Sequence, residues 1–218
     1  MPGSDEILQG LTLISNQFAW LAIIWHLFFY FLIAALFLNW KPGNQLLATF
    51  LGFPLISVSI LAWFTGNPFN GLLFAIFGIL LVVYGLRTND NPVTTVHSWN
   101  TAFGIVVIVF SLIYPHFLET DNYFNYLYMA PVGLIPCPTL SVAIGFAILY
   151  NGFQSRKWTW VLIIPGLIYG TIGVFRLEVY LDMVLLIASI VLIVVNFQVR
   201  KNATSHREAI RHREKSPA

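Results

Sequence analysis

A single cysteine between two prolines is the feature of this sequence with the clearest chemical potential. The motif Pro136-Cys137-Pro138-Thr139 lies inside an apolar run over residues 130–150. A thiolate is a nucleophile and a ligand for soft metals. Because Cys137 is the only cysteine, an intramolecular disulfide, a CxxC redox pair and a multi-cysteine metal site are excluded. A lone nucleophile, a lone soft ligand or a small buried packing residue remain.

Ionisable side chains that interrupt apolar segments form a second group. Such groups are costly in lipid and mark functional sites by default. From the helical rise, His26 lies about 12 Å, Cys137 about 10 Å and Asp182 about 7–8 Å below one membrane surface. Glu178 and Asp182, four residues apart, are expected on one helical face. The candidate ligand or ion-binding residues are Cys137, His26, Asp182, Glu178, Arg176 and His116.

Each of these residues also has a structural interpretation, which stays open. Glu178 and Asp182 suit the dipole of a helix in whose first turns they lie, and Arg176 would pair with one of them at the interface. His26 would then hydrogen-bond a carbonyl of a neighbouring helix. A metal site, if present, would use Cys137 and His26 as soft ligands.

The elements that position these residues are predicted to include a broken helix. Pro136 and Pro138 lack an N–H and clash with the preceding helical turn, and unpaired backbone groups are not tolerated against lipid. We expect the break at Pro136, Pro138 and Thr139, with a half-helix over residues 138–150 and Cys137 at its cap. The alternative is a simple proline kink with a cysteine that only packs.

The composition predicts an all-α, polytopic membrane helix bundle. Hydrophobic residues make up 58% and charged residues 9%, whereas soluble domains carry about 25% charged residues. The first residues carry Asp5 and Glu6 without a basic stretch, so no signal peptide is expected. The bundle should occupy residues 1–199. Seven transmembrane helices are expected over residues 18–38, 45–65, 69–86, 96–114, 130–150, 158–175 and 177–199.

The basic residues predict the direction of the chain through the membrane. Seven crossings place the two ends on opposite sides. With the amino end outside, Arg176 is the only Lys or Arg on the outer side, which agrees with the cytoplasmic excess of basic residues in membrane proteins. We therefore expect the N-terminus outside and the C-terminus inside. Residues 200–218 then form a basic cytoplasmic tail that contacts anionic lipid.

Two stretches carry a resemblance to a known family. Tyr114-Pro115 at the end of one apolar segment, followed by a loop and Pro136-Cys137-Pro138-Thr139, resembles an uncharacterised family of bacterial multi-pass membrane proteins that has a Pro-Cys-Pro-Thr motif and no assigned function. The region from Asn16 to Trp20 is a weaker match. The resemblance implies a location in the bacterial cytoplasmic (inner) membrane.

Three functional hypotheses follow. The leading one is a small-solute or ion permease, with a soft metal as one candidate substrate, because broken helices at depth bind substrates in transporters. The alternative is a structural or sensory membrane subunit. A thiol-dependent intramembrane enzyme, with Cys137 as nucleophile, His26 as base and Asp182 orienting it, is less favoured.

The expected partners are few. The lipid bilayer surrounds the bundle, no nucleic acid is expected at a net charge of +2, and a homo-oligomer stays open. No cofactor is expected. A retinal Schiff base needs a lysine inside the bundle, and all four lysines fall at interfaces or in the tail.

Overall fold

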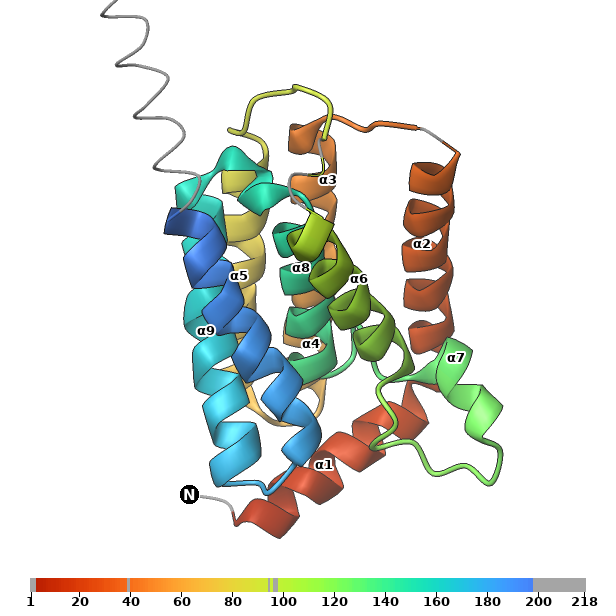
Figure 1. The fold of residues 1–218 in the computed structure, drawn as a ribbon. Helices are drawn as coiled ribbons and strands as arrows, with labels where there is room; N and C mark the ends of the chain where they lie inside the picture. Colours follow the sequence, from red (N-terminus) through yellow and green to blue (C-terminus); the bar gives the residue numbers. More distant parts are fainter. Residues whose placement is uncertain (1–2, 39, 94, 96–97, 198–218) are drawn as a thin grey trace, which may run out of the picture.

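The computed structural model describes residues 3–197, except 39, 94, 96 and 97. The described part of the chain is all-α, and it has no strand (Figure 1). The predicted basic tail, residues 200–218, lies outside the described residues. The helices are α1 (Ser4–Gln17), α2 (Ala19–Phe37), α3 (Asn44–Phe50), α4 (Phe53–Phe64), α5 (Pro68–Gly85), α6 (Ser98–Ile113), η1 (Tyr123–Asn125), α7 (Tyr126–Met129), α8 (Pro136–Leu149), η2 (Asn151–Gln154), α9 (Arg156–Phe175) and η3 (Tyr180–Asp182). The 3-10 turn η3 opens the last described helix, Tyr180–Phe197.

Helix α8 is the centre of the bundle. Thirteen of its fourteen residues are buried, and α6, α9 and α4 pack around it (Figure 1). A close crossing with α6 depends on glycine, since a Cβ at Gly104 would lie 2.9 Å from the carbonyl oxygen of Gly145. Small residues at a crossing let two helix backbones approach closely, as in membrane helix pairs. The motif at the start of α8 is therefore enclosed by protein.

Helix α1 lies across one end of the bundle, at 73° to α2 (Figure 1). The predicted helix over residues 18–38 has its described counterpart in α2, while α1 precedes it and was not predicted. One face of α1 packs on the core through Leu8, Leu11 and Ile14, and Asp5 and Glu6 are exposed in its first turn. This division into an apolar and a polar face suits a helix at the end of an apolar bundle.

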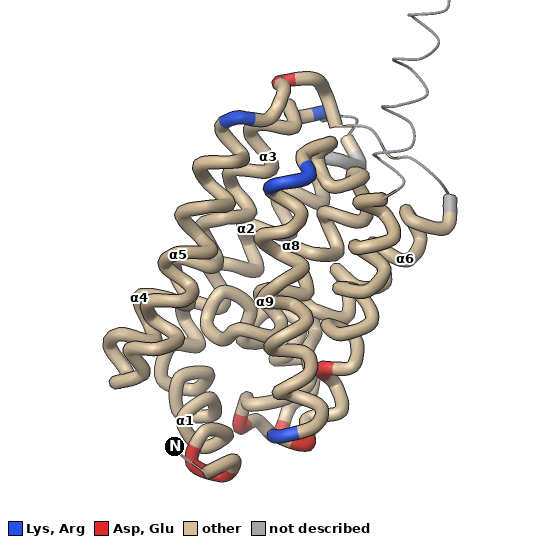
Figure 2. The backbone as a smooth tube through the Cα atoms, turned by 90° about the vertical axis from the view of Figure 1, so that its left-hand side faces the viewer, with Lys and Arg blue, Asp and Glu red and all other residues tan. Residues whose placement is uncertain are grey.

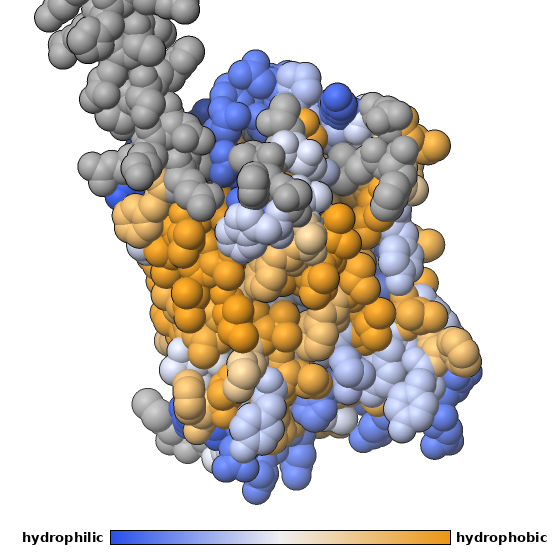
Figure 3. All heavy atoms as spheres, viewed as in Figure 1, coloured by the Kyte–Doolittle hydropathy of each residue, from blue (hydrophilic) through white to orange (hydrophobic). Residues whose placement is uncertain are grey.

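On the face that Figure 3 shows, the surface of the bundle is apolar between two polar ends. Among the described residues, four helical stretches are long and apolar enough to cross a membrane, or five if the bent pair of α1 and α2 is one span. These stretches are Asn44–Phe64, Pro68–Gly85, Arg156–Phe175 and Tyr180–Phe197. Helices α6 and α8 are apolar but shorter. The helical bundle is thus confirmed, while the number of crossings stays a prediction.

The start of the last helix differs from the prediction. A helix from residue 177 would place Glu178 and Asp182 on one face. Instead Glu178 has φ 57°, a left-handed conformation that a helix cannot contain, and the helix begins at Tyr180. The prediction that Glu178 and Asp182 share a helical face is therefore wrong.

Candidate functional site

The chain turns inside the protein before α8 begins. Residues 130–135 are non-helical and buried. Gly133 has φ +77°, and a Cβ there would overlap the ring of Trp25 on α2. Glycine is required at this position because it adopts positive φ without strain and leaves room for the tryptophan. The apolar run is therefore divided between a buried turn and a helix, and the turn is fixed against α2.

The two prolines reduce the number of unpaired N–H groups at the buried start of α8. The first four N–H groups of a helix have no partner within it. Here Ile135 is the N-cap, and its N–H donates to the Pro131 carbonyl at 3.2 Å. Pro136 and Pro138 at the first and third helical positions have no N–H. Only the N–H of Cys137 is left of the four, so this buried helix start has few donors to satisfy.

Thr139 closes the same turn from inside the helix. Its Oγ1 accepts a hydrogen bond from the Gly133 N–H at 2.8 Å and donates one to the Ile135 carbonyl at 2.6 Å. Helix α8 begins at Pro136, two residues earlier than the predicted half-helix. Cys137 is accordingly the second residue of the helix and not its cap, which corrects the prediction.

A buried carboxyl group lies against the start of α8. Asp182 is 2% exposed, and its Oδ1 accepts a hydrogen bond of 2.6 Å from the Tyr114 hydroxyl. The side chain of Cys137 contacts the same carboxyl. Oδ2 of Asp182 lies against Gly173 of α9, where a Cβ would overlap this oxygen. We call Tyr114, Cys137, Gly173 and Asp182 the Asp182 cluster.

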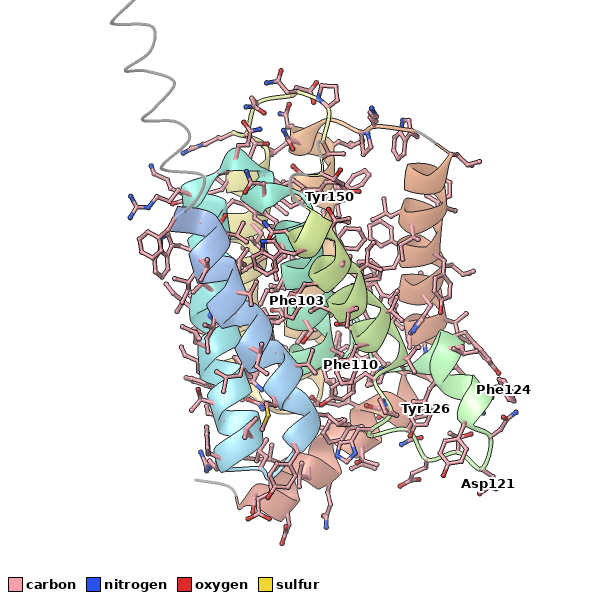
Figure 4. All side chains as sticks on the ribbon, in the orientation of Figure 1. Phe103, Phe110, Asp121, Phe124, Tyr126 and Tyr150 are labelled. Carbon is pink, nitrogen blue, oxygen red and sulfur yellow. The ribbon has the colours of Figure 1, made fainter. Side chains whose placement is uncertain are left out.

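The four members of the cluster come from four different elements. Tyr114 follows the last residue of α6, Cys137 is in the first turn of α8, Gly173 is near the end of α9 and Asp182 opens the last helix. Phe110, on the last turns of α6 (Figure 4), packs edge-on to Tyr114 with ring centroids 6.0 Å apart. The first turn of α8 carries the positive end of the helix dipole, which favours a carboxylate nearby.

A small cavity lies under α1, and no residue of the Asp182 cluster lines it. Its volume is about 20 Å³, enough for one water molecule. Thr65, Asn67 and Asn70 supply polar groups, and Pro136 brings the start of α8 to its wall. Apolar side chains line the rest of it, from Leu11, Ile14, Val58, Ala62 and Leu134.

A tyrosine connects the cavity side to the cysteine. The Tyr169 hydroxyl on α9 donates a hydrogen bond of 2.6 Å to Oδ1 of Asn70. Tyr169 is also close enough to Cys137 for the two side chains to interact electrostatically. Tyr169 therefore interacts with a residue of the cavity wall, Asn70, and electrostatically with Cys137.

His26 occupies a different place from the one that the enzyme hypothesis requires. Its ring is 1% exposed. Nδ1 lies 2.8 Å from the Ala22 carbonyl, and Nε2 lies 2.8 Å from the Leu112 carbonyl near the end of α6. Both ring nitrogens are thus engaged by main-chain oxygens and joined to neither Cys137 nor Asp182. The structure shows His26 connecting α2 to α6.

The remaining candidates lie outside the cluster. Arg176 and Glu178 are exposed, on the connection between α9 and the last helix. His116 is half-buried in the loop after α6 and packs edge-on to Phe117, with ring centroids 4.2 Å apart. Partial burial lowers the pKa of His116. Asp121 and Phe124 are on the same connection, where it projects away from the bundle (Figure 4).

Within the described ranges, no three His, Cys, Asp or Glu side chains come together as a metal-binding group. The structure therefore adds no support to the soft-metal hypothesis. The sequence reasoning missed Tyr114 as a partner of Asp182, although an aromatic hydroxyl at the end of an apolar segment was the available signal. It also missed Gly173, because only the folded structure shows which glycine makes room for a carboxyl group.

Comparison with known proteins identifies a family. No curated protein and no solved structure matches the chain. A family model, described as a family of unknown function (DUF6064), matches residues 14–207, and this range contains all members of the Asp182 cluster. Since the match covers most of the sequence, the chain belongs to this family of unknown function, DUF6064.

Proposed function

We propose that the protein is a multi-pass protein of the bacterial inner membrane, with seven crossings and the amino end outside. The apolar belt between two polar ends supports embedding in lipid (Figure 3). Lys and Arg lie mostly at one end of the bundle, and Asp and Glu mostly at the other (Figure 2). The basic end would face the cytoplasm, with the tail over residues 200–218 on anionic lipid.

Within that frame we propose a small-solute or ion permease whose working site is the Asp182 cluster. The observation that carries the proposal is a buried carboxyl group at the buried start of a helix. Ionisable groups inside a membrane protein are expensive and are associated with ion and substrate pathways. Helix starts at depth also form the binding sites of many transporters. The six initial candidates are reduced to Cys137 and Asp182, joined by Tyr114.

A structural or sensory subunit is the second candidate, and one observation favours it. The cavity of about 20 Å³ has room for no more than one water molecule and is too small for a solute. For a permease, the helices around Cys137 must therefore open during the transport cycle. In a structural protein they stay closed.

Access to Cys137 distinguishes the two candidates, because the chain has no other cysteine. In right-side-out vesicles, a permease open towards α1 predicts that a membrane-impermeant methanethiosulfonate modifies Cys137. Asp121→Cys and Asn91→Cys, each with Cys137→Ser, are matched controls from exposed loops at opposite ends. The first should react only in right-side-out vesicles and the second only in inverted ones.

Reaction of both controls without reaction of Cys137 from either side would reject the permease and leave the structural candidate. Reaction of Asn91→Cys from outside would reject the orientation. The two parts of the proposal therefore fail separately.

A further inference from the structure

The two contacts of the His26 ring specify its protonation state. Nδ1 lies 2.8 Å from the Ala22 carbonyl oxygen, and Nε2 lies 2.8 Å from the Leu112 carbonyl oxygen. A carbonyl oxygen only accepts hydrogen bonds, so each ring nitrogen must donate. A neutral imidazole has one N–H and one bare nitrogen, whereas an imidazolium has two N–H groups. The imidazolium therefore satisfies both contacts, and a neutral ring would place a lone pair against one of the oxygens.

We infer that His26 binds a proton as an imidazolium and that this proton ties α2 to the end of α6. Proton uptake forms one N–H bond on the ring and converts hydronium into water, and no bond between heavy atoms changes. The inference goes beyond the proposed permease, because neither transport nor the Asp182 cluster enters it. It gives α2 an attachment to the bundle that depends on proton binding.

The surroundings of the ring stabilise a positive charge. Leu112 is the second-last residue of α6, so its carbonyl is one of the four that have no partner within the helix. The same end of α6 carries the negative end of the helix dipole, which favours a cation. The ring of Tyr30 lies 5.8 Å away between centroids, within the distance at which an aromatic ring attracts a cation. These groups offset the cost of a charge on a ring that is 1% exposed.

The other titratable groups on the elements around His26 are engaged elsewhere or face water. The hydroxyl of Tyr30 donates to a main-chain carbonyl of α7. Tyr114, which follows α6, and Cys137 of α8 both contact Asp182. Those of α1, of α7 and of the loop after α6 are exposed or have other contacts, and they include Asp5, Glu6, His116, Glu119, Tyr126 and Tyr128. Main-chain oxygens are therefore the hydrogen-bond acceptors of the ring.

The connection between α2 and the bundle changes when this proton is lost. Trp25, His26 and Tyr30 each donate a hydrogen bond to another element, α4, α6 and α7 respectively. Of these three donors, only the histidine exchanges a proton near neutral pH. Both nitrogens belong to one rigid ring, so a neutral ring that turns its bare nitrogen from one oxygen also shifts the contact to Leu112. Because the ring is buried, proton exchange with water requires α2 to move away from α6.

Solid-state NMR of the full-length protein in lipid, with ¹⁵N-labelled histidine, reads the protonation state. In an imidazolium both ring nitrogens carry a proton and resonate close together, whereas the bare nitrogen of a neutral ring resonates far downfield. We expect imidazolium signals of His26 at about pH 5 and neutral signals at about pH 9, a span that covers most histidines in folded proteins. His26→Phe should remove these signals, and His116→Gln should remove a different set.

Spin labels report whether the proton ties the two helices. Phe31 of α2 and Val106 of α6 are exposed, and Phe31→Cys with Val106→Cys, in a Cys137→Ser background, places one label on each helix. The distance between the labels should lengthen and broaden as the His26 ring becomes neutral, and His26→Phe should give the longer distance at both pH values. The matched pair Leu72→Cys with Ile168→Cys, at exposed positions of α5 and α9, should not respond to pH.

The inference fails on any of three results. A bare ring nitrogen on His26 at about pH 5 would show that the ring is neutral. A ring that stays doubly protonated up to about pH 9 would show a permanent cation and no control by protons. An α2–α6 distance that is the same in both protonation states would show that the proton does not hold the helices together. The NMR titration uses the unsubstituted protein, so it decides the protonation state even if His26→Phe does not fold.

Discussion

Removing the Tyr114 hydroxyl tests the Asp182 cluster most directly. In Tyr114→Phe the aromatic ring keeps its place between Phe110 and Phe117, while Oδ1 of Asp182 loses a donor at 2.6 Å. The carboxyl is 2% exposed, so water does not replace the lost donor. Leaving a buried polar group unsatisfied costs about 1–3 kcal/mol. We expect the free energy of unfolding to fall by about 2 kcal/mol.

The partner substitution makes the prediction specific. Asp182→Leu replaces the carboxyl by an apolar group of similar shape, and loss of both partners is far less costly than loss of one. The double variant Tyr114→Phe with Asp182→Leu should therefore be more stable than the sum of the two single changes predicts, by more than about 1 kcal/mol. Unfolding by SDS in mixed micelles, followed by circular dichroism, gives all four stabilities.

A matched tyrosine provides the control. The Tyr128 hydroxyl donates to Asn125 at 2.9 Å, but at the exposed surface of α7, so Tyr128→Phe should change stability by less than about 0.5 kcal/mol. If the Tyr114 and Asp182 substitutions are additive within about 0.5 kcal/mol, their side chains do not interact. The geometry of the cluster would then be refuted.

Two further predictions concern a helix crossing and a loop. Gly104→Ala should destabilise the protein by about 1–3 kcal/mol, because its Cβ would meet backbone atoms of Gly145 and Leu149 at 2.9 and 3.0 Å. Gly10→Ala in α1, where a Cβ meets nothing within 4 Å, should stabilise by about 0.5–1 kcal/mol, and the opposite order in an SDS titration would contradict the α6–α8 crossing. The lowered pKa of His116 means that the unfolded state binds more protons as pH falls below about 6.5, so stability should decrease there. His116→Gln should remove that part of the pH dependence, and an unchanged slope would show that His116 does not contribute.

The sequence predicts features that depend on local chemistry. Two prolines around Cys137 exclude an uninterrupted helix, and the structure has a buried turn before Pro136. The position within two residues is less predictable, because proline is accepted in the first turn of a helix as well as at a break. Which proline begins α8 depends on Thr139, whose hydroxyl binds both Gly133 and Ile135.

Features that depend on tertiary contacts escape sequence reasoning. The enzyme hypothesis required His26, Cys137 and Asp182 to meet, but similar depth does not determine which helix faces which. His26 turns to the Leu112 carbonyl, and Tyr114 takes the place beside Asp182. The left-handed backbone of Glu178 could not be predicted from the sequence either, because glutamate rarely adopts positive φ. Helix α1 was missed because its apolar residues cover only one face.

The shortness of α8 has a consequence for the whole interior. Its fourteen residues extend about 21 Å, whereas the hydrocarbon layer is about 30 Å thick. A helix of full length would reach from one membrane surface to the other with packed apolar side chains. Because α8 begins only at Pro136, about a third of this thickness is left to other groups. They are the buried turn over residues 130–135, the cavity of about 20 Å³ and the Asp182 carboxyl group, at the end of the bundle that α1 covers. A bundle with an apolar surface thereby keeps a buried turn and a buried carboxyl group beside a short central helix, at the end that α1 covers.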